Sequence, residues 1–200
     1  VNKALAEYKY NDVASILYSF TWHEFCDWYV ELSKDDLYGD DAAARKRAQI
    51  VLYTVLEGLL RMLHPLMPFV TEEIWQVLPG VRPCVSIMQS EYPATAIVPG
   101  DVVAVARMDL LMEIIRAIRN IRGELEVPPG KRIKVVLDCK SPESVLVIES
   151  GSAYIKSLAR VEILEFGVAI EHPEQASTQV AGDVEVLLPL ADLVNVAEET

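Results

Sequence analysis

In the first half of the chain, hydrophobic residues occur at helical spacing. Between positions 10 and 34 apolar side chains recur every three or four residues, which predicts a helix from Asn11 or Asp12 to about Ser33. Its main stripe consists of Tyr18, Trp22, Phe25, Tyr29 and Leu32. A shorter second stripe gives the helix two apolar sides, which is typical of a helical bundle. A second long helix is predicted from Ala42 to Leu63.

The segment HPLMPFVTEEIW, from His64 to Trp75, predicts a helix break. Pro65 lacks a backbone donor and clashes with the preceding turn, so the long helix should end near His64. Pro68 disfavours the α conformation of Met67. The chain is therefore expected to turn sharply here.

A further helix is predicted directly after this turn. Thr71 suits the N-cap position, and Glu72 and Glu73 place carboxylates in the first turn, where the helix dipole stabilises them. We interpret the segment as a buried corner, in which His64 donates to a terminal carbonyl of the first helix and aromatic rings fill the gap. The corner residues are His64, Pro65, Pro68, Phe69 and Trp75.

The pattern changes in the second half from helical to alternating. Residues 81–100 read as an extended, proline-containing connector, after which Asp101 caps a helix that ends at about Arg122. Alternation from Arg132 predicts a strand. The segment SPES at 141 predicts a short helix to Glu149, followed by a second helix after Gly151.

Two further segments have strand character. VEILEF at 161–166 predicts one strand, and STQVAGDVEVLLPL at 177–190 predicts two strands joined by a Gly182-Asp183 turn. The whole pattern predicts an α+β protein: an all-α helical bundle with its connector at residues 1–100, then a helix and a small α+β subdomain with a mainly antiparallel sheet at 101–200.

Charge is distributed unevenly along the chain. The net charge of −12 argues against a general nucleic-acid binder, whose surface is usually basic. Residues 100–140, however, carry 8 basic and 6 acidic side chains, whereas residues 1–99 and 141–200 have balances of −5 and −9. The middle block is therefore the one place where the sequence favours contact with a polyanion.

Several signatures of chemistry are missing from the sequence. It contains no glycine-rich phosphate loop and no CxxC or HxxxH spacing, so we expect no catalytic residue and no metal site. The 3 cysteines are far apart, which is typical of a reducing cytosol. With no signal peptide and no long apolar run, the sequence predicts a cytoplasmic protein without a membrane partner. By spacing alone it resembles a binding or scaffold module.

Two long motifs carry a family resemblance. YNDVASILYSFTWHEFCDWYVELSK (10–34) and LLRMLHPLMPFVTEEIWQVLP (59–79) resemble the anticodon-binding helical bundle of class I aminoacyl-tRNA synthetases of the valine, isoleucine and leucine group. Within this group, FCDWYVELSK resembles the valyl-tRNA synthetases. SIMQSEYP (86–93), IIRAIRNIRGELEVPPGKRIKVVL (114–137) and VEVLLPLADLV (184–194) are similar to segments that follow in the same enzymes.

The resemblance implies a non-catalytic fragment of such a ligase. HIGH-type and KMSKS-type motifs, the editing domain, the first bundle helix and the C-terminal coiled coil of the family are not in this sequence. The implied parent is a monomer that attaches valine to tRNA(Val) using ATP with Mg²⁺; no cofactor is expected in the fragment. Its implied partners are tRNA(Val) and the catalytic domain of the same polypeptide.

Basic side chains are the candidates for tRNA contact. They are Arg116, Arg119 and Arg122; Lys131 and Arg132, with Lys134; and Lys34, Arg45, Lys46 and Arg47. Packing and ion pairing are the alternative roles for each. Two roles are open for Trp22, Trp28 and Tyr29. They can stack on bases if they are exposed, and they pack in the core if they are buried. Two other functions remain open: an isoleucyl-type fragment, and a docking or scaffold module without RNA binding.

Overall fold

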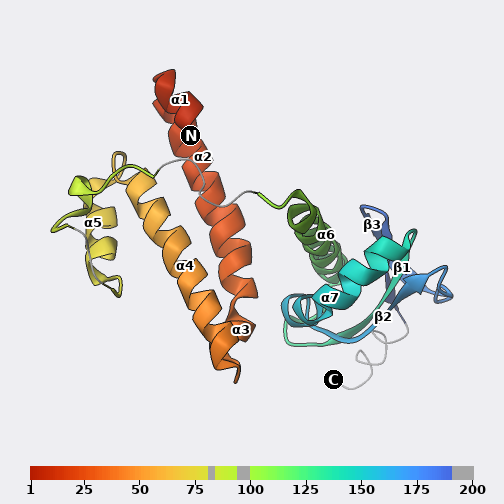
Figure 1. The fold of residues 1–200 in the computed structure, drawn as a ribbon. Coiled ribbons are helices and arrows are strands. Elements are labelled where there is room, and N and C mark those ends of the chain that lie inside the picture. The colour runs from red at the N-terminus through yellow and green to blue at the C-terminus, as the bar shows by residue number, and fades with distance from the viewer. Residues whose placement is uncertain (81–83, 94–99, 191–200) are drawn as a thin grey trace. The chain divides into compact units, whose positions relative to one another are not determined.

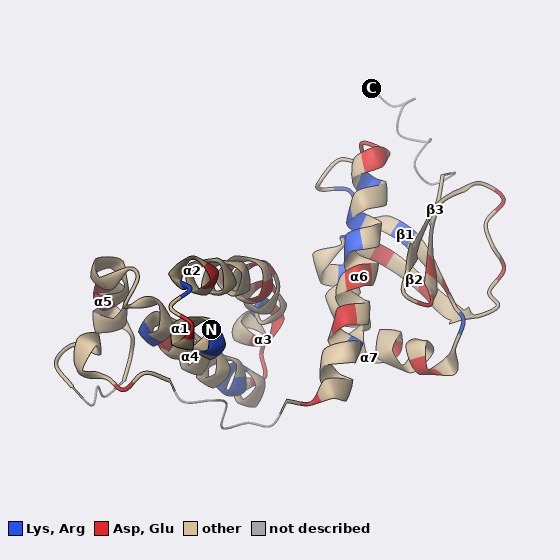
Figure 2. Cartoon of the chain, turned by 90° about the horizontal axis from the view of Figure 1, so that it is seen from above, with Lys and Arg blue, Asp and Glu red and all other residues tan. Residues whose placement is uncertain are grey.

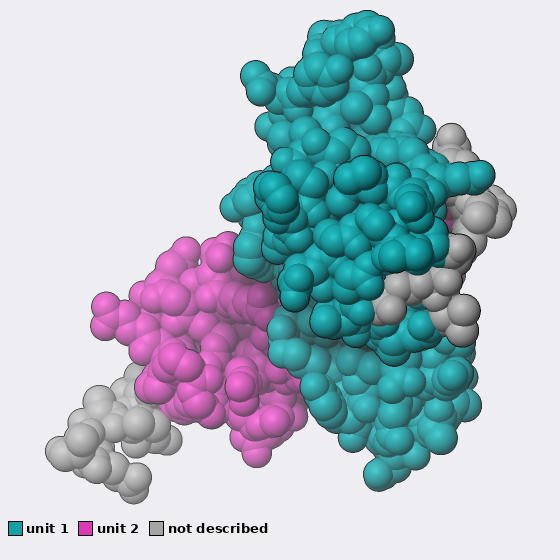
Figure 3. Space-filling model, turned by 90° about the vertical axis from the view of Figure 1, so that its left-hand side faces the viewer, with its two compact units in different colours: residues 1–99 teal, residues 100–200 magenta. Residues whose placement is uncertain are grey.

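The computed structural model describes residues 1–80, 84–93 and 100–190. The chain divides into two compact units, Val1–Pro99 and Gly100–Thr200, coloured separately in Figure 3. Part of the predicted connector and the end of the motif at 184–194 lie outside the described residues. No helix in the described ranges is both long enough and apolar enough to cross a membrane.

Every regular element described in the first unit is a helix (Figure 1). In order they are α1 (Asn2–Ala6), α2 (Tyr10–Ser19), the π-helix η1 (Phe20–Val30), α3 (Lys34–Tyr38), α4 (Ala42–Leu63), α5 (Pro68–Val77) and the 3₁₀ helix η2 (Ile87–Gln89). Helices α2 and α4 lie side by side and form the centre of the unit. The helical bundle predicted for this half is confirmed.

The first long helix differs from its predicted winding. Its N-cap is Lys9, not Asn11 or Asp12, and α2 continues directly into η1. A π-helix has more residues per turn, so a stripe at spacings of three and four does not stay on one side of it. Of the predicted stripe, Phe25 is buried whereas Trp22 is 50% exposed, and Trp28, which lies outside the stripe, is buried.

Helix α4 matches its predicted bounds. Asp41 caps its first turn, where Oδ1 accepts from the backbone amides of Ala43 at 2.7 Å and Ala44 at 3.2 Å. These two hydrogen bonds lower the pKa of the Asp41 carboxyl. The helix ends at Leu63 with His64 as its C-cap, as the proline at position 65 predicts.

The corner after α4 forms, but the predicted capping is wrong. Met67 has left the α region (φ −135°, ψ 67°), and α5 begins at Pro68, one turn earlier than expected. Proline suits the first helical position because its φ is preset and no N–H is needed there. Thr71 therefore lies inside the helix, where its hydroxyl donates to the Met67 carbonyl at 2.7 Å.

The predicted role of His64 is also wrong. Its Nδ1 lies 2.8 Å from Thr71 Oγ1, not at a terminal carbonyl of α4. Since the only hydroxyl proton of Thr71 goes to Met67, His64 Nδ1 must carry the proton for both hydrogen bonds to form. The side chains of His64 and Thr71 thus connect the end of α4 to the start of α5.

Of the two aromatic residues assigned to the corner, one is correctly placed. Trp75 is 3% exposed, packs with Leu60 and Ile87, and its Nε1 donates to Glu57 Oε1 at 3.3 Å. Phe69 is 90% exposed, so it does not fill the corner. Six residues before Trp75, it lies about 240° from it around the helix and points away from the core.

The second unit combines two helices with a four-stranded sheet. Its elements are α6 (Val102–Glu124), β1 (Ile133–Cys139), α7 (Pro142–Leu158), β2 (Val161–Val168), β3 (Ala176–Ala181) and β4 (Val184–Pro189). The strand order is β2-β1-β4-β3. Helix α7 packs on β1 and β2, α6 packs on β3 and β4, and the two helices contact each other. The α+β class is confirmed.

The sheet is mainly antiparallel, as predicted, but it is mixed because it contains one parallel pairing. Strands β3 and β4 are antiparallel and joined at Gly182 (φ +58°), and β4 is antiparallel to β1. Strands β1 and β2 are parallel because α7 crosses between them, the connection that parallel neighbours require. Two of the three strand pairings are therefore antiparallel.

Helix α7 is continuous, so the predicted break at Gly151 is wrong. Gly151 is buried where α7 packs on α6, and a Cβ at this position would clash with both methyl carbons of Leu111. The glycine permits close approach of the helices; it does not end one.

Gly151→Ala is therefore expected to destabilise the second unit by about 1–3 kcal/mol, because the buried Leu111 must move. Urea unfolding followed by circular dichroism measures this. Gly123→Ala is the matched control: Gly123 lies in α6, and a Cβ there would have no atom within 4 Å, so that change should be neutral or stabilise by up to about 1 kcal/mol. Equal effects of the two substitutions would contradict this packing role.

Asp183, in the β3–β4 turn, anchors the start of α7. Its carboxylate accepts from Ser144 Oγ at 2.7 Å and from Ser141 Oγ at 2.8 Å, and Ser141 also caps the helix. These hydrogen bonds, that of Ser144 foremost, lower the pKa of Asp183. The ionised carboxylate thus joins two elements about forty residues apart in sequence.

Because the folded-state pKa of Asp183 is depressed, its contribution to stability is complete above the unfolded pKa of about 3.9. The contribution is lost as pH falls through that value toward the folded pKa. Asp183→Asn should therefore unfold at lower urea than the parent at pH 7, with a difference that shrinks between pH 5 and pH 3. Glu149→Gln, an exposed change on α7, is the control; a pH-independent difference for Asp183→Asn would contradict the prediction.

Candidate nucleic-acid interface

The three arginines of α6 do not share one face of the helix. Three residues advance an α-helix by about 300°, so each arginine is displaced by about 60° from the one before it. Arg116 and Arg119 are exposed, whereas Arg122 is 8% exposed. Figure 2 shows the basic positions along α6 and at β1. The structure therefore places the three candidate arginines in different environments.

Arg122 holds the loop between α6 and β1. Its Nη1 donates to the Lys131 carbonyl at 2.9 Å and its Nη2 to the Pro128 carbonyl at 3.0 Å. Burial, with a smaller effect from Arg160, lowers the pKa of Arg122 from its ordinary value. The Arg122 guanidinium therefore holds in place the loop that carries Lys131.

Arg119 connects α6 to the end of α7. Its Nε and Nη2 donate to the Leu158 carbonyl at 3.1 Å and 3.0 Å. A cation at the last carbonyls of a helix is favoured by the helix dipole. Arg119 thus has a structural contact although it is exposed.

Lys131, Arg132 and Lys134 surround a hollow of about 290 Å³ at one end of the sheet. Ile133, Ile163, Leu188 and Pro189 also line it. Two acidic residues moderate the charge: Glu162 lines the hollow, and Glu165 pairs with Lys134 Nζ at 2.7 Å. The size and the three cations suit a phosphate group held by charge and by N–H donors.

Arg160 belongs to the same end of the sheet, and sequence reasoning missed it. It directly precedes β2, its carbonyl accepts from the Ile133 amide at 3.1 Å, and its side chain is close enough to influence Arg122. Because β1 and β2 are parallel, the residues that directly precede the two strands lie at the same end of the sheet. A correct parallel assignment would have brought Arg132 and Arg160 together.

The four basic residues at positions 34–47 have separate environments. Lys34 pairs with Glu31 at 2.6 Å, and Arg45 donates to the carbonyls of Leu37 at 3.1 Å and Gly39 at 2.5 Å. Lys46 and Arg47 are exposed on the first turns of α4. Arg45 therefore stabilises the α3–α4 loop, and Lys46 and Arg47 remain the more accessible pair.

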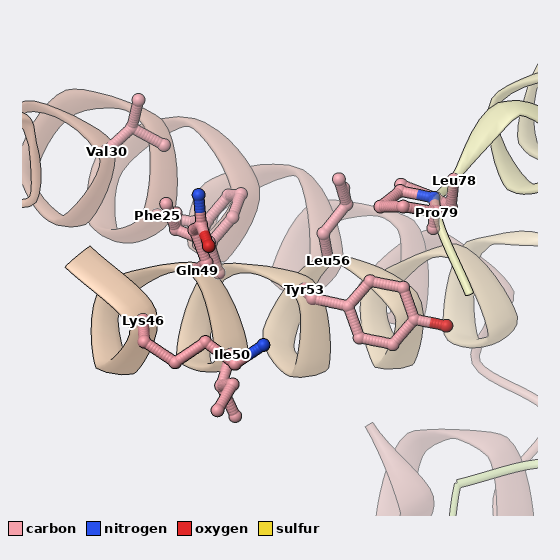
Figure 4. Close-up of a pocket in the computed structure, with 10 residues that line it drawn as sticks. Phe25, Val30, Lys46, Gln49, Ile50, Tyr53, Leu56, Leu78 and Pro79 are labelled. Atoms are coloured by element: carbon pink, nitrogen blue, oxygen red, sulfur yellow. The ribbon is translucent and has the colours of Figure 1, made fainter. Parts of the chain in front are cut away.

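The first unit has an apolar groove of about 730 Å³ beside Lys46. The residues drawn in Figure 4 come from η1, α4 and the end of α5, and include Phe25, Ile50, Tyr53 and Leu78. A second hollow of about 230 Å³ lies beside Tyr18 and Trp22, whose ring centroids are 6.3 Å apart. Trp22 is open to a stacking base, whereas Trp28 is 6% exposed and belongs to the core.

Comparison with known proteins shows the family of the chain that carries these surfaces. The family model described as the anticodon-binding domain of tRNA ligase matches residues 1–137. The chain is 62% identical over 98% of its length to a valine–tRNA ligase of Syntrophotalea carbinolica, 53% identical over 98% to that of Geobacter sulfurreducens, and 39% identical over 100% to that of Bacillus subtilis. It spans 22% of the length of each of these relatives. The chain belongs to the family of anticodon-binding domains of tRNA ligases.

Proposed function

We propose that this chain is the tRNA-binding portion of a valine–tRNA ligase and holds the anticodon region of tRNA(Val). The observation that carries the proposal is the 62% identity with a valine–tRNA ligase over nearly the whole chain. Attachment of valine, with ATP and Mg²⁺, belongs to the catalytic domain of the same polypeptide. We further propose that the parent ligase acts as a monomer in the cytoplasm.

Local basic and aromatic surfaces support RNA binding although the chain as a whole is acidic. The cations around the 290 Å³ hollow offer contacts for phosphates, which set affinity and register. The exposed ring of Trp22 offers a stacking surface for an unpaired base of an RNA loop. The acidic remainder of the chain disfavours other docking orientations, because it repels the RNA backbone.

A filter-binding titration with transcribed tRNA tests this proposal. The chain should bind tRNA(Val) at least about tenfold more tightly than a non-cognate tRNA, and its affinity should fall steeply with salt. The slope of log affinity against log salt is expected to be about −0.7 to −0.9 for each neutralised phosphate. Absent or salt-insensitive binding would instead support a docking or scaffold module.

The isoleucyl-type alternative is tested in the same assay with tRNA(Ile) as competitor. Preference for tRNA(Ile) over tRNA(Val) would overturn the valine assignment while retaining the RNA-binding function. The identities with valine–tRNA ligases favour tRNA(Val) as the expected ligand.

A further inference from the structure

Two carboxylates face the same side of the sheet at a direct cross-strand position. Asp138 of β1 is paired with Glu185 of β4 in the antiparallel register, so the two side chains project together. Like charges placed directly opposite each other destabilise a sheet unless a cation lies between them. The neighbouring residues Leu137 and Cys139 are buried on the other face, so a shift of register cannot separate the carboxylates.

The chain after β2 brings an imidazole to this pair. The Ile170 amide donates to Asp138 Oδ1 at 3.2 Å, which folds the segment after β2 back over the strand. His172 Nε2 then lies 3.0 Å from Asp138 Oδ2. One ligating atom from each of Asp138, His172 and Glu185 lies within 4.8 Å of the others. Three elements separated in sequence therefore converge on one point.

We propose that Asp138, His172 and Glu185 form a binding site for a divalent transition-metal ion of the Zn²⁺ type. Zinc takes imidazole nitrogen and carboxylate oxygen at about 2.0–2.2 Å, so its ligand atoms lie at most about 4.4 Å apart. The three ligating atoms lie within 4.8 Å of one another, so side-chain rotation has to shorten the longest separation by only a few tenths of an ångström to reach that range. The imidazole favours zinc over Mg²⁺ or Ca²⁺, which prefer ligand sets made of oxygen.

Such an ion would fasten the segment between β2 and β3 to the sheet and neutralise the facing carboxylates. Three protein ligands leave at least one coordination position for water. No metal site is evident in the sequence because positions 138, 172 and 185 are far apart. Strand pairing brings Asp138 to Glu185, and the segment after β2 brings His172 to Asp138. The inference does not depend on RNA binding.

Calorimetric titration of the 200-residue chain with ZnCl₂ tests the proposal. One ion per chain should bind with a dissociation constant in the micromolar range, and excess Zn²⁺ should raise the thermal unfolding midpoint by several degrees. His172→Ala and Glu185→Gln should each weaken binding by at least about tenfold. In a Zn²⁺ titration followed by NMR, the imidazole resonances of His172 should shift.

His23→Ala is the matched control. His23 is also an exposed imidazole paired with an aspartate, at 3.3 Å from Asp27, but within the described residues no third ligand joins this pair. This control should bind Zn²⁺ like the parent. Zinc binding that survives both His172→Ala and Glu185→Gln, or no binding at 100-fold molar excess over protein, would overturn the proposal. Glu185→Gln leaves the His172–Asp138 pair in place, and a circular dichroism spectrum equal to that of the parent would show that its loss of Zn²⁺ binding is not caused by unfolding.

Discussion

Replacing Lys131 and Arg132 together by alanine is expected to weaken tRNA binding by about 10- to 50-fold at moderate salt. Both side chains line the basic hollow at one end of the sheet, where they can approach one or two phosphates. Loss of two phosphate contacts should also reduce the salt slope by about 1.4 to 1.8. Because phosphates carry no sequence information, cognate and non-cognate tRNA should be affected alike.

Lys140→Ala is the control for this double substitution. Lys140 is exposed and directly follows β1, at the opposite end of the strand from Arg132 and about 25 Å away by strand rise. The Lys140→Ala substitution removes one positive charge from the same unit but leaves the hollow intact, so the affinity for tRNA should change by less than about twofold. An equal loss for Lys140→Ala, or a loss confined to tRNA(Val), would contradict a local phosphate site.

Arg122→Ala is expected to lower the free energy of unfolding of the second unit by about 2–4 kcal/mol. The substitution leaves the carbonyls of Pro128 and Lys131 without their charged donors and opens a cavity where the buried side chain lay. It should also weaken tRNA binding indirectly, since the loop that carries Lys131 loses its anchor. Urea unfolding and filter binding measure the two effects.

Arg116→Ala separates this structural role from a general loss of charge. Arg116 lies on the same helix but is exposed, so its replacement should cost at most about 1 kcal/mol, the upper range for an exposed charged contact, and less than that of the buried Arg122. The double substitution of Lys131 and Arg132 should likewise leave stability nearly unchanged while weakening RNA binding. If Arg122→Ala unfolds like the parent yet loses RNA affinity, Arg122 is a direct contact and the positioning role is wrong.

Local patterns in the sequence predicted most of the regular elements. The isoleucines at 114, 115, 118 and 121 have helical spacing in the sequence, and all four are at most 1% exposed in α6. Asp101 caps that helix as expected, with Oδ1 at 3.0 Å from the amides of Val103 and Ala104. These features depend on periodicity and on hydrogen bonds within a few residues, which a single sequence contains.

Other features were predicted wrongly because two local signals competed. At the corner, Pro68 as a first helical residue prevailed over Thr71 as an N-cap, and α5 began earlier. At Gly151, the glycine that suggested a helix end instead allows α7 to approach Leu111 of α6. The start of α5 and the continuity of α7 each become clear only when the helix packed against it is known, which is α4 in the first case and α6 in the second.

The sequence by itself determined the helical first half, the Asp101 cap of α6, the β3–β4 hairpin and the family resemblance. The tertiary structure decided which charged residues are available to bind RNA or a metal ion. It buried Arg122, placed Arg160 at the same end of the sheet as Arg132 through parallel pairing, and brought His172 to Asp138 and Glu185. The physical reason is range: helix periodicity and capping act over a few residues, whereas burial and strand register depend on elements tens of residues apart.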